Sequence, residues 1–101
     1  MAGTKKKITK KTIKPGKDIM ASMAEDFRKR LLKLVKQGIQ DLTIDFSGVE
    51  MVDSVGLGVL IAAHNSLEDV GGNLKIKNAS SDIYNLIKVM RLDQHFEVMP
   101  A

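Results

Sequence analysis

Hydrophobic and polar positions along the chain follow two spacings. An alternation of apolar and polar residues predicts a strand, because successive side chains of a strand point to opposite faces, whereas an apolar residue at every third or fourth position predicts an amphipathic helix. In chain order, the spacings predict an edge strand at about 7–14, a short strand at Ile19-Met20, a helix at 22–37, a strand at 41–46, a helix at 54–70, a strand at 74–77, a helix capped by Ser80 or Ser81, and a last short strand at 95–98. Strands that alternate with helices are typical of α/β folds, in which right-handed crossovers join parallel strands.

Turn and capping residues mark the ends of several elements. Pro15-Gly16 predicts a turn, so Ile19-Met20 is expected to pair back on the first strand as a hairpin. Ser22-x-x-Glu25 has the spacing of a capping box, in which the serine oxygen accepts from the N3 amide and the glutamate returns to the cap amide. The expected fold is α/β: a single small domain with a mixed four- to five-stranded sheet, parallel core strands, an N-terminal edge hairpin and helices packed on the sheet.

The apolar positions of the predicted helices indicate which side chains form the core. The chain has three Phe, one Tyr and no Trp, so Leu, Ile, Val and Met must supply most of the core. Small residues at 56, 58, 62 and 63 would allow the second helix to pack close to the sheet. The expected core stripes are Met23, Phe27, Leu31, Leu34 and Val35 on the first helix and Ile83, Leu86, Ile87 and Met90 on the third, with Leu92 and Phe96 closing the core.

The net charge of +4 is concentrated at the N-terminus. The first 17 residues hold seven lysines and no acidic residue, whereas the other 84 residues hold nine basic and twelve acidic residues, a balance of −3. Residues 1–6 are expected to form a flexible basic segment before one domain at 7–99. Such a segment can contact nucleic acid or anionic lipid, but lysines on an edge strand also prevent sheet-to-sheet aggregation. The second interpretation is favoured, because no aromatic residues are interleaved with the lysines.

The composition also bears on the cellular compartment. The chain has no Cys, which excludes disulfides and thiolate chemistry and fits a reducing compartment. No apolar run has the length of a membrane span, and the N-terminus has no apolar signal-peptide region. The chain is therefore expected to be cytoplasmic, with no membrane association.

Few residue patterns point to catalysis or to a bound cofactor. The sequence has no P-loop, no G-x-G-x-x-G after a strand and no H-E-x-x-H. His64 and His95 are far apart in the sequence with no set of metal ligands near them, so no metal is expected, and His64 is expected on the surface. Asp45 and Asp53 have two interpretations. They form a carboxylate pair, or, more simply, Asp45 ends a strand and Asp53 accepts hydrogen bonds from loop amides. Ser54 lacks the G-x-S-x-G context of a nucleophile, and we expect neither enzymatic activity nor a cofactor.

Ser54 stands at the start of a predicted helix and directly after Asp53. Its structural interpretation is an N-cap, a role that serine often fills and that spacing alone favours. Its functional interpretation is a phosphorylation site, because the unpaired N–H groups and the dipole of a helix N-terminus favour negative charge. The two roles can coexist.

The run Asp-Phe-Ser-Gly-Val-Glu-Met-Val-Asp-Ser-Val-Gly-Leu-Gly-Val-Leu, residues 45–60, resembles the signature of the STAS family of sulfate-transporter and anti-sigma-factor-antagonist domains. The resemblance covers nearly the whole chain, including the first helix and the strand after Gly71-Gly72. It implies a small bacterial regulator, an anti-sigma-factor antagonist that acts by partner switching. In such proteins the serine after the motif aspartate, here Ser54, is phosphorylated by a serine-kinase anti-sigma factor with a histidine-kinase-like ATPase domain. The unphosphorylated protein binds this kinase, the phosphorylated protein is released, and a PP2C-type phosphatase resets the cycle.

The resemblance also implies a partner-binding surface on a monomer that forms heterocomplexes, while ATP and magnesium would belong to the kinase. Two positions depart from the family pattern: Val55 stands where many members have a second hydroxyl residue, and Met20 stands where an acidic residue often precedes the first helix. The residues expected to bind the partner are Asp18, Met20, Ser22, Ser47, Gly48, Met51, Asp53, Ser54, Val55, Gly56 and Leu57.

Three alternatives stay open at this point. The domain could be a STAS scaffold subunit of a signalling complex that phosphorylation does not switch. Direct nucleic-acid binding is not expected, but if it occurred through the Lys-rich N-terminus, deletion of residues 1–11 would abolish it. The weakest alternative is an enzyme that uses Asp45, Asp53 and Ser54 as catalysts.

Overall fold

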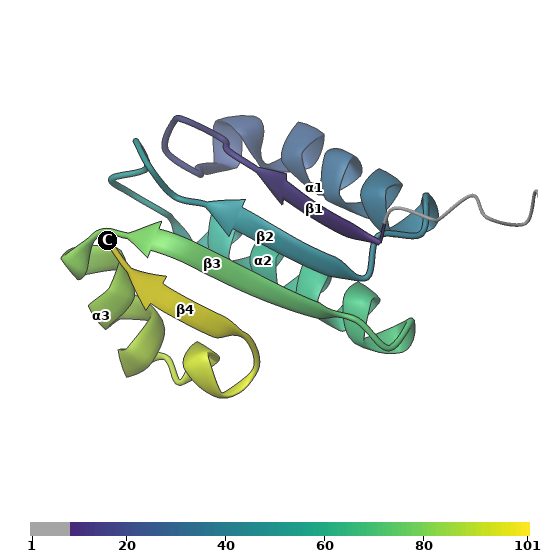
Figure 1. Ribbon diagram of the computed structural model, residues 1–101. Helices are drawn as coiled ribbons and strands as arrows, with labels where there is room; N and C mark the ends of the chain where they lie inside the picture. Colours follow the sequence, from purple (N-terminus) through teal and green to yellow (C-terminus); the bar gives the residue numbers. More distant parts are fainter. Residues whose placement is uncertain (1–8) are drawn as a thin grey trace, which may run out of the picture.

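Four parallel strands form one sheet in the part of the chain that the structure, a computed structural model, describes: residues 9–101 (Figure 1). In chain order, the elements are β1 (Lys10–Ile13), α1 (Ala21–Lys36), β2 (Asp41–Asp45), α2 (Ser54–Asp69), β3 (Asn73–Ala79), α3 (Ser81–Val89), a short 3-10 helix η2 (Leu92–Gln94) and β4 (Glu97–Pro100). The expected flexible segment at 1–6 and the expected start of the edge strand at 7 lie outside the described residues. The α/β class and the helix and strand positions from 22 onward are confirmed to within a few residues.

The strands lie in the order of the chain, β1-β2-β3-β4, and every neighbouring pair is parallel. Because each right-handed crossover moves one strand further in the same direction, the crossover helices fall on one side of the sheet. Figure 1 shows α1 and α2 side by side behind the sheet, with α3 beside β4. The N-termini of α1 and α2 therefore lie at the carboxyl ends of the strands.

The predicted N-terminal hairpin is wrong. β1 pairs in parallel with β2, with Ile13 opposite Ile44, and Ile19 makes a single parallel bridge to Val52 instead of pairing with β1. The reason is that Ile19 is completely buried and belongs to the core, so the chain after the Pro15-Gly16 turn crosses the end of the sheet to reach α1. The prediction that the first strand lies at an edge is confirmed.

The core lies between the sheet and the helices. Inward-pointing side chains of β2 and β3 pack against α1, α2 and α3, and Phe96 and Leu92 close the core as predicted. Burying each such side chain contributes roughly 1.5–3 kcal/mol relative to leaving it in water. The exception to the predicted stripes is Met90, which is 48% exposed because α3 ends at Val89. The most deeply buried large side chains are Ile19, Leu31, Leu42, Ile44, Phe46, Leu60, Leu67, Leu74, Ile76 and Ile87.

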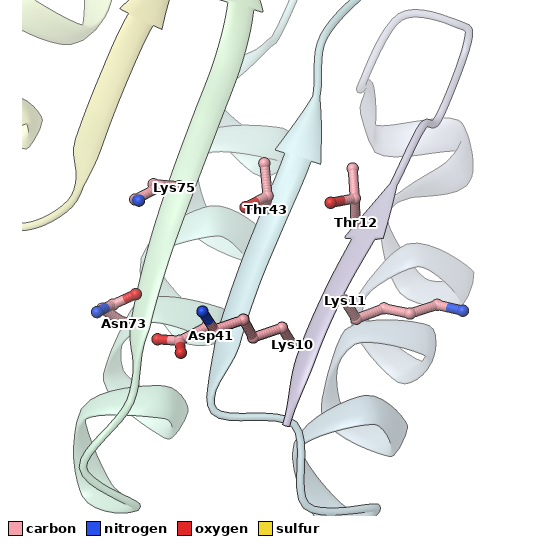
Figure 2. Close-up of a pocket in the computed structure, with 7 residues that line it drawn as sticks. All are labelled: Lys10, Lys11, Thr12, Asp41, Thr43, Asn73 and Lys75. Atoms are coloured by element: carbon pink, nitrogen blue, oxygen red, sulfur yellow. The ribbon is translucent and has the colours of Figure 1, made fainter. Parts of the chain in front are cut away.

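Within residues 9–101, the other face of the sheet carries polar side chains and is covered by no helix (Figure 1). A hollow of about 260 Å³ on this face is lined by residues near the starts of β1, β2 and β3 (Figure 2). Parallel sheets usually have both faces covered and apolar, whereas this face is open. Its polar side chains fit its exposure to water. The residues that line the hollow are Lys10, Lys11, Thr12, Asp41, Thr43, Asn73 and Lys75.

Candidate functional site

Ser54 is the first residue of α2, and its side chain is exposed. The interpretation of Ser54 as the N-cap is wrong, because the cap is Asp53, whose Oδ1 accepts a hydrogen bond of 2.7 Å from the N–H group of Gly56. A carboxylate is as good a cap as a hydroxyl, and here it leaves the hydroxyl of Ser54 without a capping role. The serine thus lies at the positive end of a 16-residue helix with its side chain open to solvent.

The carboxylate of Asp53 also caps α1. Its Oδ2 accepts a hydrogen bond of 2.8 Å from the N–H group of Ala21, the first residue of that helix. The predicted capping box of Ser22 and Glu25 is therefore wrong: the helix begins one residue before Ser22, and Glu25 bonds Arg28 instead. The N–H group of Gly56, and next that of Ala21, hold the pKa of the Asp53 carboxyl below its ordinary value.

A second carboxylate ties the same two segments together. Oδ1 of Asp18 accepts hydrogen bonds from the N–H groups of Glu50, at 2.8 Å, and Met51, at 3.1 Å. The backbone N–H group of Ile19 donates to the oxygen of Met51 at 3.0 Å, and that of Asp53 donates to the oxygen of Ile19 at 3.2 Å. Segments 18–21 and 50–53, far apart in the sequence, are therefore held side by side next to Ser54.

Gly56 allows this close approach. A Cβ atom at Gly56 would lie 2.3 Å from the backbone oxygen of Ile19, closer than any side chain can come. Gly58, by contrast, faces open space. The prediction that small residues let α2 pack closely is thus right for Gly56, although the contact is to the Ile19 segment rather than to a strand, and it is wrong for Gly58.

The surface around Ser54 combines exposed apolar and polar side chains. Met51 is 57% exposed and Val55 is 49% exposed, so both present apolar side chains to solvent in the segment that contains Ser54. Ser22 is exposed and Met20 is half-buried. Of the residues expected to bind a partner, Gly56 and Leu57 are buried, so they can support this surface but cannot present side chains on it.

Ser47 and Gly48 lie in the loop after β2, where Asp45 organises the backbone. Oδ1 of Asp45 accepts from the backbone N–H of Ser47 at 2.9 Å, from the hydroxyl of Ser47 at 2.7 Å and from Nδ2 of Asn78 at 3.0 Å. The hydrogen bond from Asn78, followed by those from Ser47, holds the pKa of the Asp45 carboxyl well below its usual range. Asp45 and Asp53 have separate sets of donors, which supports the simpler interpretation of the two residues over a carboxylate pair.

The expectation of a surface histidine is wrong for His64. Its residue exposure is 9%, and its ring lies 5.7 Å from that of His95 and 5.9 Å from that of Phe96, measured between centroids. The Nδ1 atom of His64 is buried without a hydrogen-bond partner.

Among residues 9–101, no group of three or more His, Cys, Asp or Glu side chains is placed to hold a metal ion. In the same part of the chain, no helix is long and apolar enough to cross a membrane.

Comparisons with known proteins agree on one family. The model of the STAS domain matches residues 4–101 of this chain. The chain is 32% identical over 71 residues to the anti-sigma-B factor antagonist of Bacillus subtilis strain 168, a match that covers 70% of this chain and 64% of the relative's length.

Solved structures show the same fold. A candidate anti-sigma factor antagonist from Thermotoga maritima superposes with a TM-score of 0.86 at 20% identity, covering 93% of this chain and 81% of that one. The anti-sigma factor antagonist SpoIIAA in its unphosphorylated form superposes with a TM-score of 0.70 at 19% identity, covering 92% of this chain and 80% of that one. SpoIIAA of Bacillus in its phosphorylated form gives the same TM-score at 18% identity, covering 92% of this chain and 86% of that one.

Proposed function

The chain belongs to the STAS domain family, and from this premise we propose that it is an anti-sigma-factor antagonist that acts by partner switching. In its unphosphorylated form it binds a serine-kinase anti-sigma factor with a histidine-kinase-like ATPase domain. Phosphorylation of Ser54 releases it, and a PP2C-type phosphatase restores the binding form. The similarity to a protein described as an anti-sigma-B factor antagonist supports the general role.

One observation carries the proposal: Ser54 is exposed at the first position of α2, while neighbouring Asp53 does the capping. A kinase can reach the hydroxyl without opening the helix. A phosphate there adds about −1.5 to −2 charges at the N-terminus of α2, where the dipole of the helix tolerates negative charge. Phosphorylation therefore need not unfold the domain.

The same position explains how a phosphate would weaken binding. Val55 follows Ser54 on α2 and Met51 lies in the segment before that helix, and both expose apolar surface that a bound partner would cover. A phosphate on Ser54 would bring a hydrated dianion to that surface and, together with the neighbouring Asp53 carboxylate, would repel any acidic group of the partner. The proposed switch is local and acts by charge and bulk.

The proposed contact surface retains the exposed and half-buried members of the expected set. Asp18 and Asp53 hold its two backbone segments in place, and the side chains around Ser54 make the contact. Its members are Asp18, Met20, Ser22, Ser47, Gly48, Met51, Asp53, Ser54 and Val55.

The protein itself would act as a non-enzymatic binding module in the cytoplasm, as a monomer that forms heterocomplexes. It would need no cofactor, since the ATP and magnesium used in the phosphorylation would be bound by the kinase.

The test is a pull-down from native lysate with the wild type, Ser54→Asp and Ser81→Asp as baits. Ser81 is the matched control, because it is also exposed and also the first residue of a helix, α3, behind a capping residue, Ser80. The proposal predicts that the wild type and Ser81→Asp capture a kinase with a histidine-kinase-like ATPase domain and that Ser54→Asp does not. If all three baits capture the same proteins, Ser54 is not the switch, and the scaffold role replaces the proposal.

A further inference from the structure

Charge is segregated across the molecule by the order of its strands. Residues 9–38 contain nine Lys and Arg against three Asp and Glu, whereas residues 39–101 contain four against nine. Because the strand order follows the chain order, residues 9–38 occupy one edge, formed by β1, the connection after it and α1. One edge of the molecule is therefore strongly positive while the rest is negative.

The basic side chains of this edge are exposed and mostly free of acidic partners. All nine are exposed, and within residues 9–101 the one ion pair that they form joins Arg28 to Glu25, at 2.9 Å. Asp18, an acidic residue in the same region, accepts backbone hydrogen bonds instead. The positive charge of the edge is thus available to an external ligand.

Two rows of these side chains meet along the edge. A hollow of about 160 Å³ is lined both by Lys17 and by Arg30, which places the connection after β1 against α1; Asp26 lines the same hollow without forming an ion pair with either. Lys11 points outward past the edge of the sheet, whereas Lys10 runs across the uncovered sheet face toward Asp41 (Figure 2). We define the basic face, without Lys10 and the paired Arg28, as Lys11, Lys14, Lys17, Lys29, Arg30, Lys33 and Lys36.

The side chains of the basic face favour one of three kinds of anionic partner: a protein, a membrane or a nucleic acid. The exposed large apolar residues of the described chain, Met51, Val55, Val70, Val89 and Met90, all lie outside residues 9–38. A protein partner would favour a broad apolar or aromatic centre of the interface, whereas the apolar lining of the hollow between Lys17 and Arg30 is limited to the half-buried Pro15 and Met23 and the buried Phe27. A membrane partner would favour an amphipathic helix with a free apolar stripe, but Phe27 and Leu31 of α1 are buried in the core. Phosphate-backbone binding requires only exposed cations on a rigid surface.

We propose that the basic face binds the phosphate backbone of duplex nucleic acid without reading its sequence. The one aromatic residue in 9–38, Phe27, is buried, so no base can stack on this face. With 16 residues, α1 is about 24 Å long and spans roughly seven base pairs. Binding at this face does not involve Ser54. It departs from the expectation of no direct nucleic-acid binding, which considered only the Lys-rich N-terminus, because the fold brings the cations of α1 next to those of β1 and the connection after it.

The salt dependence of binding gives a quantitative test. Seven cations that each neutralise one phosphate would give a slope of log affinity against log salt no steeper than about −6. Removing three of them makes the slope shallower by about 3 units and reduces affinity at least tenfold at about 50 mM salt. If affinity depended only on the net charge of the protein, removing any three lysines would reduce the salt slope equally, wherever those lysines lie.

The experiment measures fluorescence anisotropy of a labelled duplex of about 20 base pairs with the full chain, between about 50 and 200 mM salt. The test variant is Lys14→Gln, Lys29→Gln and Lys33→Gln together. The matched control is Lys75→Gln, Lys77→Gln and Lys88→Gln together, which removes the same charge outside the basic face. Circular dichroism confirms that both variants are folded.

The proposal predicts that the control keeps the salt slope of the wild type while the test variant loses about 3 units of it. Equal weakening of the two variants would overturn the proposal. So would the absence of wild-type binding to the duplex at the lowest salt, or binding to phosphatidylserine vesicles in place of the duplex.

Discussion

Gly56 and Gly58 lie two residues apart on α2, and the same substitution at each should have opposite effects on stability. A Cβ atom at Gly56 would lie 2.3 Å from the backbone oxygen of Ile19 and 2.9 Å from its Cγ2 atom. The nearest group is backbone and cannot rotate away, so α2 or the Ile19 segment must shift. Overpacking of this kind typically costs about 1–3 kcal/mol, which outweighs the gain of up to about 1 kcal/mol from replacing glycine in a helix.

Gly58 is the matched control. It is exposed, and no atom lies within 4 Å of the position that its Cβ would occupy. Gly58→Ala should therefore stabilise the protein by about 0.5–1 kcal/mol through helix propensity alone. In a domain of this size, each kcal/mol shifts the melting temperature by roughly 4–8 °C.

Thermal and urea unfolding followed by circular dichroism measure both variants. We expect Gly56→Ala to melt below the wild type and Gly58→Ala above it. If Gly56→Ala is as stable as the wild type, the close contact with Ile19 does not exist as described. Because that contact also holds the segment next to Ser54, Gly56→Ala should weaken partner capture in the pull-down, and Gly58→Ala should not.

Three further predictions follow from the contacts of the site and the core. Asp53→Asn should lower the urea midpoint of unfolding at neutral pH. The folded-state pKa of Asp53 lies below its ordinary value of 3.8, so the stabilisation by its carboxylate is complete above pH 3.8 and is lost as the pH falls through the folded-state pKa. The difference in urea midpoint between variant and wild type should therefore close in acid, and a difference that does not change with pH would contradict this. His64→Leu should raise stability by about 1–2 kcal/mol, because it removes the unpartnered Nδ1 from the core and gives up only a 3.9 Å contact between Nε2 and the exposed carboxylate of Glu68. His95→Leu at an exposed position should change little, and destabilisation by His64→Leu would show that Nδ1 has a partner. Met51→Ser with Val55→Ser should abolish kinase capture while changing the melting temperature little, since both side chains are already exposed, and retention of the kinase would move the contact surface elsewhere.

Local sequence patterns predicted the elements well but not all of their partners. The alternation of apolar and polar residues at 41–46 placed β2, and the apolar stripes of the helices placed α1 and α3, because these signals depend on neighbours in the chain. The hairpin failed because the Pro15-Gly16 turn is compatible with several directions of the following chain, and the burial of Ile19 against α2 decided between them.

The failures at the site have the same origin. Ser22 had the spacing of a cap, but Asp53, from a segment far along the chain, supplies the carboxylate that caps Ala21. His64 stands among polar residues of α2, yet Phe96 and Leu92 from the C-terminal segment cover it. Contacts between distant segments decided each case, and a pattern read along one element cannot show them.

Mapping of the phosphorylated residue would show whether Ser54 is the switch. The kinase captured by the wild type would be incubated with the protein, ATP and magnesium, and the modified site would be located by tandem mass spectrometry. We expect one phosphate, on Ser54, and loss of kinase binding by the phosphorylated chain, with no phosphate on Ser54→Ala. A phosphate on another residue, or a phosphorylated Ser54 chain that stays bound to the kinase, would contradict it.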